Sequence, residues 1–243
     1  PREIVRWGDR EFETVGVQCL KDLPNRQAEG PFAFEYNGFY YLTYPYVRED
    51  TEVLAYAMSR NPMGPYEYKG LIMAEHANDC WTNHHSIVNY KGQWYLFYHH
   101  NAFSPHFDKN RSAQIERLYF NPDGTIQEVK PTMRGVGPVK AVQKVHIDRY
   151  STIDGAAIEY LDTTDYFKGW KTVFAQTGDN VTFNELDFGK KAPKKVTICY
   201  KAASDAVVEV KAGDVCIEVA LPASDVWTEA VVKVKGKIKG LRN

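Results

Sequence analysis

One aromatic hairpin pattern occurs twice along the chain, and it restricts the possible folds more than any other feature. The stretch YNGFYYLTY (36–44) aligns with YKGQWYLFY (90–98), so that Gly, Tyr and Leu recur at a constant offset of 54 residues. Each copy is followed by an Asn-Pro turn with Gly, at 61–64 and at 121–124, an offset of 60. Turn residues between alternating apolar stretches indicate β-hairpins. A four-stranded unit that repeats at this spacing is typical of a propeller blade.

The repeat predicts two complete blades, at about 29–80 and 81–132, each with four strands. Residues 1–28 are interpreted as the end of an earlier blade. Propellers close with ~4–8 blades, so the chain is expected to be the C-terminal part of a longer propeller. No segment shows convincing helical periodicity, and we therefore expect an all-β protein.

The sequence changes character after Thr132. Residues 133–140 are rich in glycine and predict a linker, and from about 143 onward short alternating strands follow one another between regularly spaced turns. This pattern is typical of a β-sandwich, here expected as a jelly roll. The sequence therefore predicts two domains, the blades over 1–135 and a sandwich over 143–243 that lacks its last strand.

Composition argues against several classes of function. The formal charge is −1 and the isoelectric point is near 6.8, which is unlike a nucleic-acid-binding surface. Lysine pairs at 190–191 and 194–195 lie among turn residues and are interpreted as solvated surface. No apolar run approaches the ~20 residues of a membrane span. The four cysteines form no CxxC pair, so a zinc knuckle is not expected, and Cys199 and Cys216 fit buried thiols within strands.

Glu29 is the candidate for acid catalysis. It precedes the inner strand of the first blade in EGPF (29–32), and NHHS (83–86) precedes the inner strand of the second, so both are expected to face the propeller axis. A carboxylate walled by aromatic residues loses solvation, which raises its pKa. A glutamic acid protonated near neutral pH is what a glycosidase needs as its general acid. The alternative is a glutamate in a solvent-exposed turn.

EGPF, NGFYYLTY and TNHHSIVNYKGQWYLFYHH, in this order and at blade spacing, resemble glycoside hydrolase family 43 over about residues 1–135. The resemblance implies a five-bladed propeller enzyme that acts on polysaccharides containing arabinose and xylose. It also implies an inverting mechanism, in which one Asp is the base, Glu29 is the acid, and a second Asp tunes the pKa of that acid. Both Asp residues belong to earlier blades, and no Asp of this chain sits in a matching motif.

The same resemblance implies further site residues in this chain. His84 would face the active site or support a structural calcium ion through water, with a hydrogen-bonded core histidine as the alternative. Arg111 would contact the sugar, unless it forms a surface salt bridge with Asp108 or Glu116. Phe32 and Trp81 would wall the pocket, with plain packing as their alternative reading. Zinc is not expected, because the spacing of three neighbouring histidines matches no known site: His99, His100 and His106.

The stretches VHIDRYSTIDG and TGDNVTFNELDFG resemble carbohydrate-binding module family 6 over about 143–243. The resemblance places Asp148 at a structural calcium site. Where members of that family usually have a Trp, this chain has Asn180. Three aromatic residues remain as candidates for a sugar-stacking platform, each with core packing as the alternative: Tyr166, Trp170 and Trp227.

These observations favour a secreted or periplasmic, monomeric glycosidase of the arabinofuranosidase or xylosidase type. Its partner would be arabinoxylan or a xylo-oligosaccharide, with no nucleic acid and no membrane. Two alternatives remain. One is a non-catalytic polysaccharide-binding protein, because the two Asp residues are missing. The other is a propeller phosphorylase, which would need a basic phosphate pocket that the sequence does not offer beyond Arg111.

Overall fold

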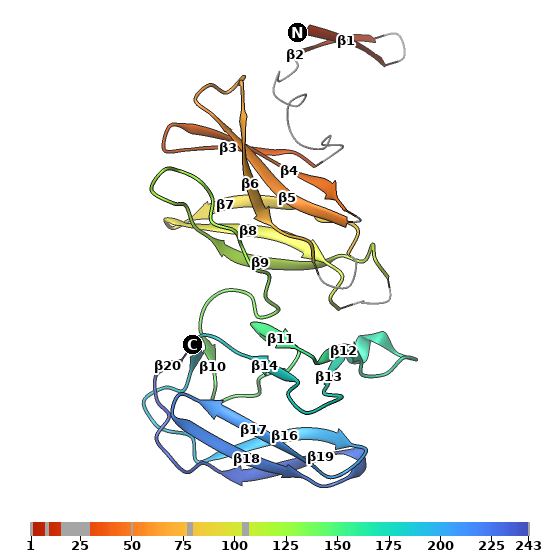
Figure 1. The fold of residues 1–243 in the computed structure, drawn as a ribbon, viewed down its shortest axis with the longest axis vertical. Helices are drawn as coiled ribbons and strands as arrows, with labels where there is room; N and C mark the ends of the chain where they lie inside the picture. The colour runs from red at the N-terminus through yellow and green to blue at the C-terminus, as the bar shows by residue number, and fades with distance from the viewer. Residues whose placement is uncertain are drawn as a thin grey trace. The chain divides into compact units, whose positions relative to one another are not determined.

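The computed structural model describes six ranges of the chain, and in these it is built of β-strands with one short 3₁₀ turn (Figure 1). The all-β prediction is therefore confirmed for the described residues, and these include no helix with the length and apolar character of a membrane span. Contacts divide the chain into unit 1, which comprises Pro1–Val136 and Asp154–Asn180, and unit 2, which comprises Gly137–Ile153 and Val181–Asn243. The described ranges are 2–7, 10–15, 30–49, 51–76, 80–103 and 107–242.

Unit 1 contains the first predicted blade as a four-stranded antiparallel sheet. Its strand order β3-β4-β5-β6 follows the sequence, as in a meander. The strands are β3 (Phe32–Tyr36), β4 (Phe39–Arg48), β5 (Thr51–Ser59) and β6 (Glu67–Met73). A separate hairpin pairs β1 (Arg2–Trp7) with β2 (Arg10–Val15). Every residue of β5 is buried, as expected for an inner strand of a sheet that is covered on both faces.

The second predicted blade has three strands in the described residues rather than four. Its order is β7-β8-β9, formed by β7 (His85–Tyr90), β8 (Gln93–His100) and β9 (Ser112–Leu118). The expected fourth strand is reduced to a single bridge between Phe120 and Ile126. The chain beyond it turns to the first sheet instead, because Val129 N–H donates to the carbonyl of Ile72 in β6 at 2.7 Å.

The repeat is visible in the turns as well as in the strands. Asn37 and Gly38 both have positive φ (55° and 72°), and so do Lys91 and Gly92 (52° and 83°), their equivalents in the second copy. Two consecutive residues with positive φ form the tight turn whose twist matches that of a hairpin. Gly64 N–H donates to Asn61 O at 2.9 Å, and Gly124 N–H donates to Asn121 O at 3.0 Å, so the Asn-Pro turns are also equivalent.

A single hydrophobic core joins the two sheets. Phe34 stacks on Tyr41 with ring centroids 4.6 Å apart and also contacts Trp94 of the second sheet at 5.3 Å. Two hydrogen bonds cross between the repeats. The Tyr41 hydroxyl donates to Gly124 O at 2.7 Å, and Ile126 N–H donates to the Tyr56 hydroxyl at 2.9 Å. Aromatic pairs such as Phe34–Tyr41 and Phe34–Trp94 each add about 0.5–1.5 kcal/mol of stability beyond the contribution of the area they bury.

Short strands follow the second sheet. Four longer strands form two antiparallel pairs, β16 with β19 and β17 with β18, around an apolar cluster that includes Tyr200, Ile217, Val219 and Leu221. The β-sandwich over 143–243 stays a prediction, and the contacts group Asp154–Asn180 with unit 1. The elements are β10 (Val139–Lys140), β11 (Thr152–Asp154), β12 (Ala157–Tyr160), η2 (Tyr166–Lys168), β13 (Trp170–Val173), β14 (Asn180–Thr182), β15 (Leu186–Asp187), β16 (Lys195–Ala202), β17 (Ala206–Ala212), β18 (Val215–Leu221), β19 (Ser224–Lys233) and β20 (Leu241–Arg242).

The two cysteines in these strands are exposed, so the prediction of buried thiols is wrong for both. Side chains alternate between the faces of a strand. Because Tyr200 and Ile217 occupy the buried face, the neighbouring Cys199 and Cys216 point outward.

Candidate functional site

The two motifs that define the candidate site meet at Gly30 and His84. Gly30 lies just before β3 and has φ of 66°, and a Cβ at this position would come within 3.0 Å of Cε1 and Nδ1 of the His84 ring. Only glycine combines this backbone conformation with such a close approach. The backbone just before β3 therefore packs directly on the imidazole of the residue that precedes β7. Glu29, which precedes Gly30 in the sequence, lies outside the described residues.

His99 is the partner that sequence reasoning missed, since it entered only as a rejected zinc ligand. His84 N–H donates to Nε2 of His99 at 3.1 Å, and the two rings lie 6.0 Å apart at an angle of 23°. Burial, together with the nearby charge of Arg111, lowers the pKa of His99 to about 4. His99 is therefore neutral near pH 7, with the proton on Nδ1, because Nε2 accepts a hydrogen bond.

The side chain of His85 faces the neighbouring sheet. Thr43 is fully buried and donates its hydroxyl proton to Phe32 O at 2.9 Å, so its oxygen can accept from Nε2 of His85 at 2.6 Å. Burial lowers the pKa of His85 to about 4, which keeps the ring neutral. The side chain thus ties β7 to β3 and β4, and it fixes the strand heads that carry the site.

Glu52 holds the backbone of the histidine loop. Its carboxylate is buried and accepts from Asn83 N–H at 2.7 Å, while its own N–H donates to Trp81 O at 3.3 Å. These bonds anchor residues on both sides of Thr82 to the start of β5. The sequence offered one signal for this role. Glu52 is a charged residue near the head of a strand that is otherwise mostly apolar, TEVLAYAMS (51–59).

Two further histidines pack behind the site. His76 stacks on Tyr98 at 5.6 Å and meets His100 at 5.4 Å. Nδ1 of His100 accepts from Ala102 N–H at 2.8 Å. Burial lowers the pKa of His76 to about 4 and that of His100 to about 3. Both rings are therefore neutral packing groups near pH 7.

The remaining propeller residues are placed as follows. Arg111 is exposed just before β9, close enough to His99 to influence its pKa. Within the described ranges no ion pair joins Arg111 to Asp108 or Glu116. Asp108 contacts Lys109 at 3.4 Å, and Glu116 accepts from Thr132 N–H at 2.8 Å.

Phe32 and Trp81 differ in exposure. Phe32 is half-buried, packs on the core and contacts the His85 ring at 6.3 Å. Trp81 is 40% exposed, and its backbone N–H donates to Asp108 O at 2.9 Å. The plain packing role therefore describes Phe32 well, whereas the indole of Trp81 remains available to a ligand.

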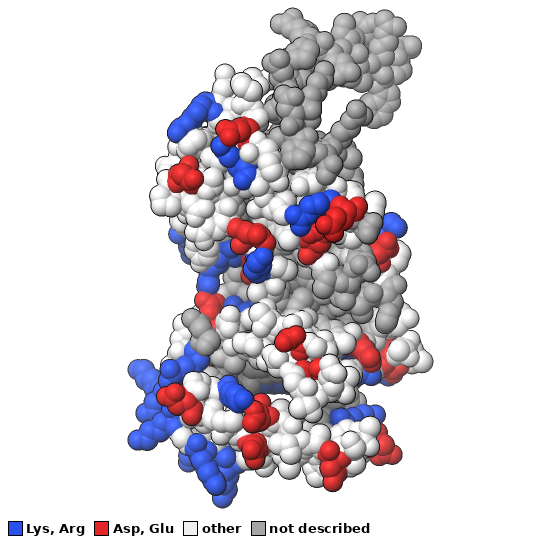
Figure 2. All heavy atoms as spheres, viewed as in Figure 1, with Lys and Arg blue, Asp and Glu red and all other residues white. Residues whose placement is uncertain are grey.

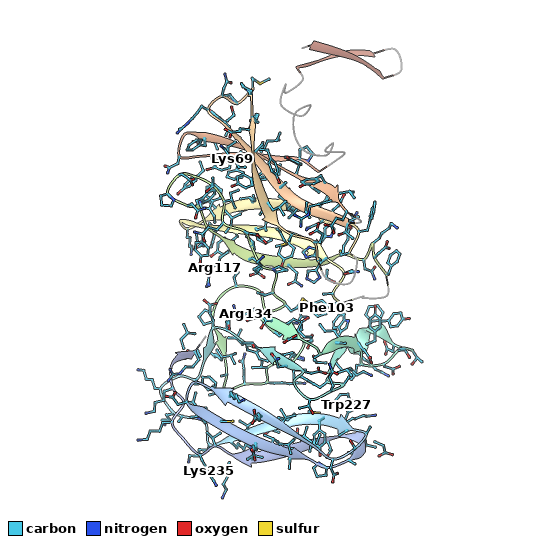
Figure 3. The ribbon with its side chains drawn as sticks, in the orientation of Figure 1. Lys69, Phe103, Arg117, Arg134, Trp227 and Lys235 are labelled. Atoms are coloured by element: carbon cyan, nitrogen blue, oxygen red, sulfur yellow. The ribbon has the colours of Figure 1, made fainter. Side chains whose placement is uncertain are left out.

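The three aromatic candidates beyond the second sheet also differ. Trp170 donates its indole N–H to Phe103 O at 2.7 Å and packs on the Phe103 ring at 4.6 Å, so it serves as an anchor (Phe103 is labelled in Figure 3). Tyr166 is 59% exposed and stacks on Tyr160 at 4.4 Å. Trp227 is 45% exposed on β19.

The geometry gives no support to a calcium or zinc site. The described residues include no group of three or more His, Cys, Asp or Glu side chains placed to hold a metal ion. Asp148 is buried beside Arg149, with Oδ2 and Nε 3.6 Å apart, and imidazoles such as His84 are poor ligands for a hard cation. His106 lies outside the described residues. Calcium at His84 or Asp148 stays a prediction.

Comparison with known proteins finds a family that matches the first part of the chain. The family model that matches is Glycosyl hydrolases family 43, over residues 13–126, a range that includes EGPF, NHHS and both hairpin repeats. The matched segment contains Gly30, His84, His99 and Glu52. The resemblance to this family is thus confirmed for the first part of the chain.

Curated relatives cover the chain in part. A β-xylosidase of Xylanibacter ruminicola is 41% identical over 118 residues, which are 49% of this chain and 36% of the relative. An arabinoxylan arabinofuranohydrolase of Bacillus subtilis is 33% identical over 195 residues, 66% of this chain and 36% of the relative. The chain thus matches about a third of the length of these relatives.

A solved structure is also similar to the chain. It is a family 43 arabinoxylan arabinofuranohydrolase from Bacillus subtilis in complex with cellotetraose, 23% identical, with a TM-score of 0.48 over 89% of this chain and 49% of that one.

Proposed function

We propose that the chain is part of an inverting glycosidase that removes arabinofuranosyl or xylosyl units from plant polysaccharide. One observation carries the proposal. The glycine of the EGPF motif lies against the histidine of the NHHS motif, so two segments 54 residues apart converge at one edge of the sheets. The names of the relatives, β-xylosidase and arabinoxylan arabinofuranohydrolase, support the choice of substrate class.

In this proposal Glu29 is the general acid that protonates the departing glycosidic oxygen. The base that activates water would come from outside this chain's motifs, since no Asp here occupies a matching position. In this proposal His84 and His99 lie close to Glu29, because Gly30 contacts the His84 ring, and the neutral ring of His99 adds no charge that would favour ionisation of the acid. Arg111 and Trp81 supply a cationic donor and an exposed aromatic face of the kind that sugars bind.

The test is Glu29→Gln in the complete protein from which this chain derives, assayed on xylobiose, arabinoxylan and an aryl glycoside with an acidic leaving group. Loss of a general acid costs about 10²–10⁴-fold in rate. We expect that loss on xylobiose and a much smaller one on the aryl glycoside, because its leaving group needs little protonation. Binding of xylo-oligosaccharide should persist.

Glu67→Gln is the matched control, since Glu67 is a carboxylate with a 77% exposed side chain whose ion-pair partner in the described residues is Lys69. It should leave the rate unchanged. Equal losses of rate on xylobiose and on the aryl glycoside would reject Glu29 as the acid. Near-normal turnover of Glu29→Gln would reject it as well. Retardation of the unmodified protein in xylan gels without release of sugar would favour the non-catalytic binding protein.

A further inference from the structure

Two lysine-rich segments that are far apart in the sequence lie together in unit 2. They are GKKAPKK (189–195) and KVKGKIKG (233–240). Backbone hydrogen bonds join them at both ends, from Val234 N–H to Lys194 O at 3.0 Å and from Gly240 N–H to Gly189 O at 2.9 Å. The fold therefore brings together lysines that the sequence presents as two unrelated surface runs. We call these eight lysines the lysine patch: Lys190, Lys191, Lys194, Lys195, Lys233, Lys235, Lys237 and Lys239.

All eight side chains of the lysine patch are exposed. Figure 2 shows Lys and Arg side chains gathered beside β20, and Figure 3 labels Lys235 in the same region of unit 2. Within the described residues no ion pair joins a member of the patch to a carboxylate. The nearby Asp187 uses Oδ1 to accept from Gly189 N–H at 2.8 Å, within its own turn.

The lysine patch contrasts with several other lysines of the chain. Lys211 contacts Glu209 at 2.5 Å, and Lys171 contacts Glu159 at 3.2 Å, as on an ordinary mixed-charge surface. In the patch, β16 and β19 instead place Lys195 directly opposite Lys233. Like charges in facing positions of neighbouring strands destabilise a sheet. Packing and folding thus give no reason for this arrangement.

Charge is also divided unevenly between the two units. Unit 2 has 14 Lys and Arg against 9 Asp and Glu, a net charge of +5, and unit 1 has 16 against 22, a net charge of −6. The near-neutral total therefore conceals a basic unit. A concentrated positive potential attracts polyanions and raises their local concentration.

We propose that the lysine patch binds an acidic polysaccharide, one that has uronate groups spaced along a neutral backbone. The choice of polysaccharide rests on the proposed function. Ammonium groups on flexible side chains act as separate point charges, which suits carboxylates at irregular spacing. Duplex DNA has one charge per ~1.7 Å, and the chain as a whole, with a net charge of −1, lacks the basic excess that binding so dense a polyanion would need.

The test measures binding by the 243-residue chain and requires no hydrolysis. The probes are glucuronoxylan and the same polymer after reduction of its carboxyl groups. Replacement of Lys191, Lys235, Lys237 and Lys239 by Gln should weaken binding of glucuronoxylan about tenfold at low salt. The unmodified chain should bind the reduced polymer as weakly as the variant does, and added salt should remove the difference.

A matched control replaces four exposed lysines outside the patch, Lys91, Lys109, Lys130 and Lys144, and so makes the same change in net charge. It should retain at least half of the affinity. If the fourfold patch variant does not fold, the pair Lys235→Gln and Lys237→Gln replaces it. Equal binding of the native and reduced polymers, an equal effect of the control, or tighter binding of duplex DNA would overturn the proposal. Failure of the hydrolase assay would leave this binding result unaffected.

Discussion

At the scale of single residues, Gly30 is the most constrained position of the candidate site. Its positive φ and its contact with the His84 ring act together, because any side chain here meets the imidazole at 3.0 Å. Gly92 has a similar φ of 83°, but a Cβ there would meet no atom within 4 Å. Substitutions at the two glycines can therefore be compared, to separate the free-energy cost of the backbone conformation from that of the contact with His84.

We expect Gly92→Ala to lower the free energy of unfolding by about 1 kcal/mol, from backbone strain alone. Gly30→Ala should lower it by about 2–4 kcal/mol, because the ring of His84 must also move. Urea unfolding of the 243-residue chain measures both. Equal effects of the two changes would show that the contact with His84 adds nothing.

At the scale of structural elements, the hairpins and their turns were predicted correctly, because Asn-Gly, Lys-Gly and Asn-Pro turns are determined by local sequence. The fourth strand of the second sheet was not. Val129 bonds to Ile72 in the other sheet, and such a choice of partner depends on contacts between distant segments. The contact between Gly30 and His84 agrees with the expected convergence of EGPF and NHHS. His99 and Glu52 contribute through hydrogen bonds that no sequence motif predicts.

Glu52 provides a prediction at this scale, since it anchors the loop before β7 to the head of β5. Glu52→Gln keeps an oxygen that can accept from Asn83 N–H, and Glu52→Ala leaves that buried donor without its partner. We expect Glu52→Ala to cost about 1–3 kcal/mol more in unfolding free energy than Glu52→Gln. Hydrogen exchange at the Asn83 and His84 amides should speed up in the Ala variant alone. Matching exchange rates in the two variants would contradict the role of Glu52.

At the scale of the whole molecule, four imidazoles that are buried or half-buried make the fold sensitive to acid. Their pKa values in the folded protein are lowered by burial to about 4 for three and about 3 for the fourth: His76, His85, His99 and His100. Unfolding returns each pKa to about 6.5. Between these values the unfolded chain binds more protons than the folded one, so stability rises with pH in this window.

We therefore expect the free energy of unfolding to fall steadily as the pH drops from about 6.5 to about 4. Outside that window these four histidines should contribute less to its pH dependence. Denaturant unfolding across this range measures the slope. His85→Asn should reduce the slope by about one proton. A flat profile between pH 6.5 and 4 would show that these rings can be protonated without loss of the fold.

The hydrogen bonds that cross between the repeats affect how the molecule loses its structure. In the turn of the second repeat, Gly124 O and Ile126 N–H form hydrogen bonds with Tyr41 and Tyr56 of the first. Neither sheet can then open without exposing polar groups of the other, so the two repeats form a single cooperative folding unit. Duplicated hairpins that look interchangeable in the sequence have become mutually dependent, and separate expression of either one would yield a chain without its main source of stability.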